Sequence, residues 1–94
     1  MEKIEKYEMM NKVLRGLDDI KNSETSLLKK IAQIEAENIN LGIGMLDRTL
    51  PNIHEMSDNS IQAIDKIIEE FTEYKDKFAR DNKLEVDVLA TEET

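Results

Sequence analysis

The chain has 94 residues with no Cys, no Trp, three Gly and one Pro, and 36% of its residues are charged. Few helix-breaking residues combined with many Glu and Lys are typical of long helices. The absence of Cys excludes disulfide frameworks and thiolate metal sites. Thirteen basic against 21 acidic residues give a net charge of −8, which repels phosphate backbones, so we expect no direct binding of nucleic acid.

The first predicted element is a helix over residues 2–45. Its apolar side chains recur at alternating steps of three and four residues, which is the spacing of a coiled-coil seam. This apolar ladder consists of Met10, Val13, Leu17, Ile20, Leu27, Ile31, Ile34, Leu41 and Met45, with Glu24 and Asn38 at its two polar steps. An Asn at such a position either fixes the register of a partner helix or marks the end of the interface.

Residues 22–26, Asn-Ser-Glu-Thr-Ser, are the weakest part of this helix. Short polar side chains compete with the helical backbone for hydrogen bonds, and a break here would produce a three-helix bundle. The ladder nevertheless keeps its phase from Ile20 through Glu24 to Leu27, which a turn would not preserve. We therefore predict a continuous helix and keep the three-helix bundle as the alternative.

A connection is predicted over residues 45–57, because Pro51 disfavours a helical conformation of the residue before it. In this connection the single His, His54, is expected to be a solvated loop residue. A second helix is predicted over 58–81, with Ser57 or Asp58 as its cap. The predicted fold class is thus all-α, an antiparallel helical hairpin with one long coiled-coil-like helix and one shorter helix.

We expect residues 1–82 to form a single helical domain and residues 83–94 to form a loose acidic tail. In that tail Leu84, Val86 and Val88 alternate with acidic residues, which is the period of a strand. Residues 84–89 could therefore join the sheet edge of a partner on binding, and this alternative stays open.

The predicted helix lengths indicate association. A helix over 2–45 is about 65 Å long, whereas the second helix of about 35 Å covers only the half of the ladder nearest the connection. The remaining apolar residues would need another copy or a partner helix, because exposing several of them costs free energy. The predicted partner-binding residues are Met10, Val13, Leu17, Ile20, Leu27 and Asn38.

No pattern of residues carries an identifiable chemistry. His54 lacks a second His, a Cys or a nucleophile at motif spacing, so we predict no enzyme, no metal site, no cofactor and no small-molecule substrate. The first residues alternate in charge where a secretory signal needs an apolar core, and no apolar run approaches the length of a membrane span. A cytoplasmic protein is expected, and export without such a signal stays open.

The predicted function is a helical protein-interaction module, such as a small adaptor, assembly factor or targeting partner, that binds a protein or itself through the heptad seam. In size and hairpin plan the chain resembles the small helical partners of type VII secretion. It lacks the tryptophan-glycine turn of that group, and neither Tyr7 nor Tyr74 is followed four residues later by an acidic residue, so no family is assigned.

The alternative function is an acidic inhibitor that binds a basic nucleic-acid-binding protein. An acidic face of Asp65, Glu69, Glu73 and Asp76 on the second helix would imitate the charge of a nucleic acid. The same acids could equally form a solvated helix surface. Affinity that collapses with moderate salt would favour charge mimicry, whereas pairing through the seam should persist.

Overall fold

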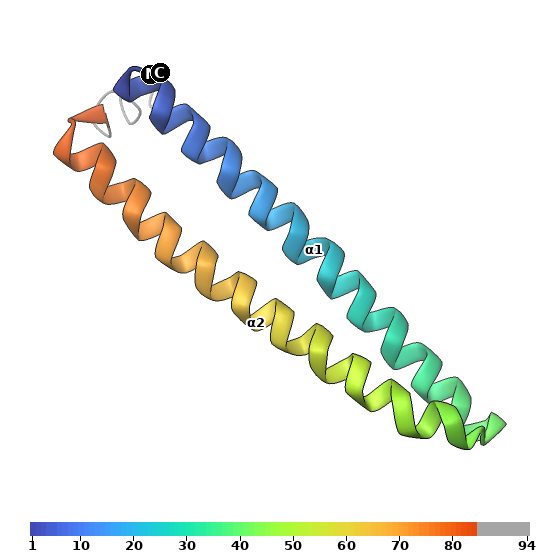
Figure 1. Ribbon diagram of the computed structural model, residues 1–94. Helices are drawn as coiled ribbons and strands as arrows, with labels where there is room; N and C mark the ends of the chain where they lie inside the picture. Colours follow the sequence, from blue (N-terminus) through green and yellow to red (C-terminus); the bar gives the residue numbers. More distant parts are fainter. Residues whose placement is uncertain (85–94) are drawn as a thin grey trace. The chain divides into compact units, whose positions relative to one another are not determined.

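The computed structural model describes residues 1–84 and contains two helices, α1 (Lys3–Leu41) and α2 (Gly44–Asp81) (Figure 1). The described part of the chain has no strand, and the predicted all-α helical hairpin is confirmed. Neither of these two helices has an apolar stretch long enough to cross a bilayer. The predicted tail over 83–94, with its alternating segment 84–89, lies outside the described residues except for its first two residues.

Helix α1 runs without a break through residues 22–26, as the phase of the ladder predicts. The hydroxyl of Thr25 donates a hydrogen bond to the carbonyl oxygen of Lys21 at 2.8 Å, so this polar side chain is satisfied within the helix. The helix ends at Leu41 and not at residue 45. Gly42 has a φ of +71° and donates its N–H to the Asn38 carbonyl at 2.7 Å, which is a left-handed helix terminus.

Helix α2 begins at Gly44, so the predicted connection over 45–57 and the predicted start at residue 58 are wrong. Pro51 lies inside the helix, although it has no N–H for the helical hydrogen bond. Contacts in the turn before Pro51 explain why the helix continues: Leu50 is buried, and Asp47 accepts a hydrogen bond from the Asn38 side chain. Tertiary packing therefore outweighs the local preference of the proline.

The longer α2 overturns the argument from helix lengths. The helix has 38 residues, almost as many as the 39 of α1. Met10 is buried and Leu17 is half-buried, contrary to the expectation that the second helix is too short to cover them. Val13 and Ile20 are exposed as expected. The reason is that they lie outside the side of α1 that packs against α2, and not that α2 is too short to reach them.

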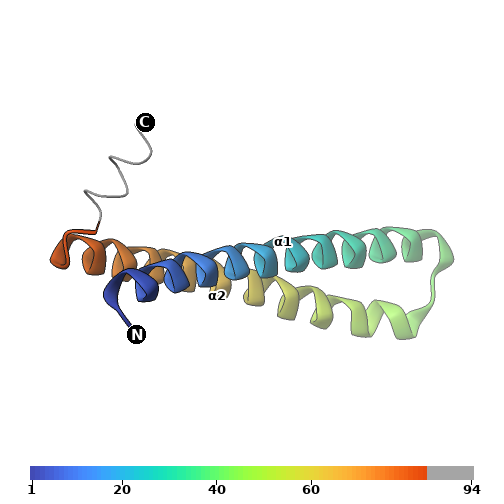
Figure 2. The same cartoon turned by 90° about the horizontal axis from the view of Figure 1, so that it is seen from above.

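The chain divides into two compact units. The bend unit, Asp19–Asp65, holds the end of α1, the connection and the first half of α2, and Figure 2 shows its turn from one helix into the other. Its buried apolar residues are Ile31 and Leu50, supported by the half-buried Leu28, Ile61 and Ile64. The bend unit is thus a helical hairpin with a narrow core.

Among the described residues, the terminal unit consists of 1–18 and 66–84. Tyr7, Met10 and Ala79 are buried in it. The ammonium group of Lys75 donates a hydrogen bond to the Asn11 side-chain oxygen at 2.9 Å and lies 5.7 Å from the centre of the Tyr7 ring. A cation over an aromatic face is attractive, so Lys75 joins the two helix segments of this unit although it is charged.

Gly16 provides a first prediction about stability. A Cβ atom added at Gly16 would meet nothing within 4 Å, and the residue lies inside α1, where Gly is unfavourable. We expect Gly16→Ala to raise the free energy of unfolding by about 1 kcal/mol, measured by thermal denaturation followed by circular dichroism. Gly42→Ala is the control and should have the opposite effect, because Gly42 has a φ of +71°. Equal shifts for the two variants would contradict this account.

Candidate functional site

The side chains of α1 that are not exposed follow a heptad pattern, as in a helix packed against one other helix. They are Tyr7, Met10, Leu14, Leu17, Lys21, Glu24, Leu28, Ile31, Glu35 and Asn38, with Asn11 and Thr25 beside them. Half of these positions, those of Met10, Leu17, Glu24, Ile31 and Asn38, belong to the predicted ladder. The other half are Tyr7, which precedes the ladder, and Leu14, Lys21, Leu28 and Glu35, each of which lies one residue after a ladder position. The side of α1 that packs is therefore rotated about the helix axis relative to the prediction.

This rotation leaves an aliphatic line of α1 in solvent. In the bend unit the residues Ile20, Leu27, Ile34 and Leu41 are 48%, 48%, 45% and 66% exposed. We call these four residues the aliphatic row. They are spaced by seven residues, about two helical turns, and therefore lie on one line along the helix. In the terminal unit Val13 has the same heptad position and is 45% exposed.

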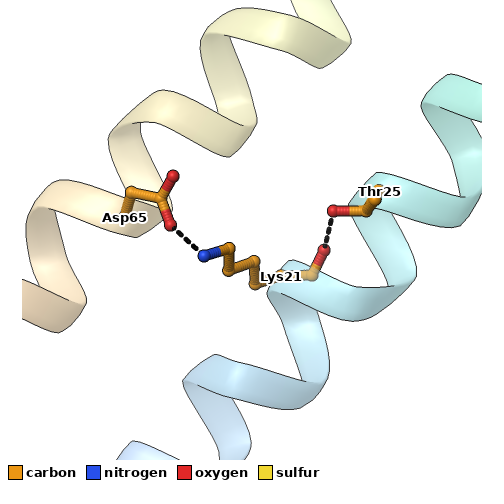
Figure 3. A network of polar contacts seen from close by, with 3 residues as sticks. All are labelled: Lys21, Thr25 and Asp65. Atoms are coloured by element: carbon orange, nitrogen blue, oxygen red, sulfur yellow. Dashed lines mark hydrogen bonds and ion pairs between the residues drawn. The ribbon is translucent and has the colours of Figure 1, made fainter.

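Polar pairs across the bend unit explain which side of α1 faces α2. The ammonium group of Lys21 lies 2.6 Å from a carboxylate oxygen of Asp65 (Figure 3). Glu35 and His54 also meet, with 2.5 Å between Oε1 and Nδ1. Lys21 and Glu35 occupy the packed side of α1 because each has a partner on α2. If aliphatic residues occupied this side instead, Asp65 and His54 would lose these contacts.

Asn38 is 2% exposed and belongs to the bend itself. Its side-chain NH₂ donates to the Ile43 carbonyl at 3.1 Å and to Asp47 Oδ1 at 2.8 Å. Its side-chain oxygen accepts the Ile43 N–H at 3.0 Å. The amide that the sequence suggested as a contact with a partner helix is thus used inside the chain, where it joins the end of α1 to the first turn of α2.

Two exposed apolar residues of α2 lie on the same side as the aliphatic row. Ile34 directly precedes Glu35, and Ile53 directly precedes His54, the residue that Glu35 contacts. Because the two helices of the bend unit run in opposite directions, the residues preceding a facing pair lie on the same side of both helices. Ile53 is 47% and Met56 69% exposed. We call the aliphatic row together with Ile53 and Met56 the apolar face.

A pocket of about 450 Å³ lies on the other side of the bend unit. Its apolar walls are formed by Ala32, Ala36, Ile39, Leu50 and Pro51, and Glu35, Asn38, Asp47 and His54 complete its lining together with Leu46. All of its polar side chains already have partners within the chain, since Glu35 contacts His54 and Asn38 bonds Asp47. The pocket therefore offers an apolar hollow but no free group for catalysis.

The predicted acidic residues are divided between the two units. Asp65 lies in the bend unit and is paired with Lys21. Glu69, Glu73 and Asp76 belong to the terminal unit, where the two Glu are exposed and Asp76 is half-buried. One of the four predicted acids is thus engaged inside the chain and another is partly covered.

The six predicted partner-binding residues separate into two groups. Met10, Leu17 and Asn38 face the interior of their units, whereas Val13, Ile20 and Leu27 are exposed. The sequence prediction omitted Ile34, Leu41, Ile53 and Met56 from this set. The uninterrupted aliphatic spacing of Val13, Ile20, Leu27, Ile34 and Leu41 was the available signal, because the alternative row, Leu14, Lys21, Leu28 and Glu35, is partly charged.

His54 is not the solvated loop residue that the sequence suggests but a half-buried helix residue beside Glu35. Within residues 1–84 no group of three or more His, Asp or Glu side chains is placed to hold a metal ion. Comparison of the chain with protein-family models, with curated proteins and with solved structures found no match.

Proposed function

We propose that the protein is a non-enzymatic helical interaction module that binds a protein helix on the apolar face of the bend unit. The observation that carries this proposal is the choice of packed side. The chain packs a row containing Lys21 and Glu35 against itself and leaves four aliphatic residues exposed at heptad spacing. Exposed apolar residues scattered singly need no explanation, whereas a contiguous apolar face is typical of an interaction site.

The free energy available to such an interface is substantial. Complete burial of a Leu or Ile side chain contributes about 1.5–3 kcal/mol. The four residues of the aliphatic row are 45–66% exposed, so covering what is left of them contributes roughly 3–6 kcal/mol in total. Ile53 and Met56 add to this value. Burial of this face is therefore a driving force for docking a helix, and it offsets part of the translational and rotational freedom lost on association.

The chemistry of the face favours an amphipathic helix as the ligand. The residues of the aliphatic row are spaced by seven, as are the apolar residues of a coiled-coil helix. The apolar side chains of such a helix can therefore insert between those of the row. The net charge of −8 disfavours a phosphate backbone as the ligand. The partner is therefore proposed to be a protein that presents an apolar heptad seam.

Photo-crosslinking tests this function. A benzoylphenylalanine residue introduced in place of Ile34, at the centre of the aliphatic row, is expected to give a discrete crosslinked protein species in the native cells. The same residue in place of Lys29 is the control, because Lys29 is exposed on the opposite side of α1. The physical reason for the difference is that a docked helix comes within bond-forming distance of only one side.

Two results decide the outcome of the crosslinking. A discrete adduct from position 34 that is absent from position 29 supports the module, and its mass identifies the partner. A smear of equal intensity from both positions, or no adduct from either, would show that the apolar face has no specific occupant.

A further inference from the structure

We propose that the occupant of the apolar face is a second copy of this chain, docked with its α1 antiparallel to the first. This inference rests on the proposed function and adds the identity of the partner and its direction. The two copies would be related by a two-fold axis beside Ile34, so that Ile34 meets Ile34 of the second copy and Leu27 meets Leu41. A two-fold interface uses the same surface on both copies and must therefore be complementary to itself.

The charges beside the aliphatic row have this self-complementarity. Lys30 and Glu37 are exposed and flank the row on the side away from α2, four residues before and three residues after Ile34. An antiparallel second copy brings each Lys30 to within about one residue of Glu37 of the other copy. Two opposite-charge pairs form by symmetry. A parallel copy would instead place Lys30 against Lys30 and Glu37 against Glu37, and like charges repel.

Helix α2 is compatible with the same axis. Ile53 lies beside Ile34 on the apolar face, so the axis that relates the two Ile34 residues also brings the two Ile53 residues together. The residues of α2 at the corresponding heptad positions over 49–63 are all uncharged: Thr49, Ile53, Met56, Ser60 and Ala63. No unpaired charge would be buried on this half of the interface, which removes the largest penalty against docking.

The area of the face sets the expected strength. The overlap of α1 around Ile34 extends from Leu27 to Leu41, about 15 residues or roughly 22 Å, and two helices side by side are about 20 Å wide. Each copy therefore contributes on the order of 500 Å², and the pair on the order of 1,000 Å². This is the lower limit for a specific protein interface, so a dissociation constant in the micromolar range is expected rather than an obligate dimer.

The oligomeric state of the full chain tests the proposal. Sedimentation equilibrium from about 1 to 500 μM is expected to show reversible dimerisation. Ile34→Asp should weaken it by more than about a hundredfold, because the axis places the two carboxylates together. Asn22→Asp introduces the same charge on the opposite, exposed side of α1 and should leave the dimer unchanged. Far-UV circular dichroism should show that both variants remain helical.

Exchange of the two charges tests the direction. Lys30→Glu and Glu37→Lys should each weaken the dimer on the order of tenfold at low salt, because each replaces two attractive pairs by two repulsive ones. The double variant carrying both changes should recover the wild-type constant. Both residues are exposed, so neither change is expected to affect folding of the single chain. A double variant as weak as the single ones would overturn the antiparallel arrangement.

The failure of this proposal can be told apart from the failure of the proposed function. A wild-type chain that stays monomeric at 500 μM would eliminate the second copy as the occupant. If the residue at position 34 nevertheless forms a discrete adduct with another protein in cells, the interaction module stands with a different partner. If it forms none, both proposals fail.

Discussion

Ile31→Ala is expected to lower the free energy of unfolding by about 2–4 kcal/mol, whereas Ile34→Ala should lower it by less than about 1 kcal/mol. Both residues are Ile on the same helix and belong to the same predicted ladder. Ile31 is 5% exposed and lies in the core of the bend unit, so its truncation leaves a cavity in addition to the lost burial. Ile34 is 45% exposed, and solvent can occupy the space that the alanine leaves.

Chemical denaturation followed by circular dichroism measures this difference. The experiment is best performed near 1 μM protein, because a low concentration reduces the fraction of dimer and so the stabilisation that a second copy adds. Ile34→Ala is the matched control, because it makes the same chemical change on the same helix. If the two variants lose equal stability, the packed side of α1 has been misassigned, and the apolar face would lose its basis.

The continuity of α1 and the hairpin could be predicted because both depend on local pattern. The steps from Ile20 to Glu24 to Leu27 hold the phase of the ladder through a segment of poor helix formers. The end of α1 was misplaced by four residues, since Met45 continues the apolar spacing beyond the true terminus at Leu41. The true terminus is marked by Gly42, whose φ of +71° is the left-handed conformation common just past the end of a helix.

The packed side of α1 could not be obtained from apolarity alone. Judged by hydrophobicity, the line through Ile20, Leu27 and Ile34 is a better interior than the line through Lys21, Leu28 and Glu35. What decides against it is the position of Asp65 and His54 on the other helix, at long sequence separation. Pairs of this kind depend on the register of the hairpin, which becomes visible only once α2 is known to begin at Gly44.

Pro51 caused the largest error in the sequence prediction. The rule that proline interrupts a helix describes an isolated segment, in which nothing offsets the missing hydrogen bond. In the bend unit the turn before Pro51 is held by the Asn38 contact to Asp47, and Leu50 is buried. After the proline, His54 contacts Glu35, so the helix is held on both sides of Pro51. The extra residues of α2 supply Ile53 and Met56, which complete the apolar face.

The polar pairs between the two helices of the bend unit contribute more to the choice of register than to stability. An ion pair such as that of Lys21 with Asp65 contributes little to stability, particularly where both side chains are about half exposed. Such pairs do distinguish one register of the two helices from its neighbours, because a shift would separate opposite charges. We infer that the bend unit uses polar contacts to fix its own register and keeps its aliphatic residues for association.

Asn38→Ala is expected to have the second large effect on stability. The side chain is buried and makes three hydrogen bonds, two to backbone groups of Ile43 and one to Asp47. Its removal leaves the Ile43 N–H without this acceptor and Asp47 without this donor at the start of α2. Unsatisfied buried polar groups cost about 1–3 kcal/mol each, and solvent that enters the bend recovers part of this. We expect a net loss of about 2–3 kcal/mol.

Thermal denaturation and amide hydrogen exchange together test this role of Asn38. A loss of about 2–3 kcal/mol corresponds to a fall in melting temperature of roughly 10–20 °C for a domain of this size. Asn40→Ala is the control, since Asn40 lies two residues further along α1 and is exposed, and its effect should stay within about 0.5 kcal/mol. Exchange of the Ile43 N–H should accelerate only in the Asn38 variant, because that proton loses its acceptor. A variant that melts like the wild type and retains slow exchange at Ile43 would show that the bend is held by Gly42 and the helix contacts alone, and that the buried amide contributes nothing to the position of α2.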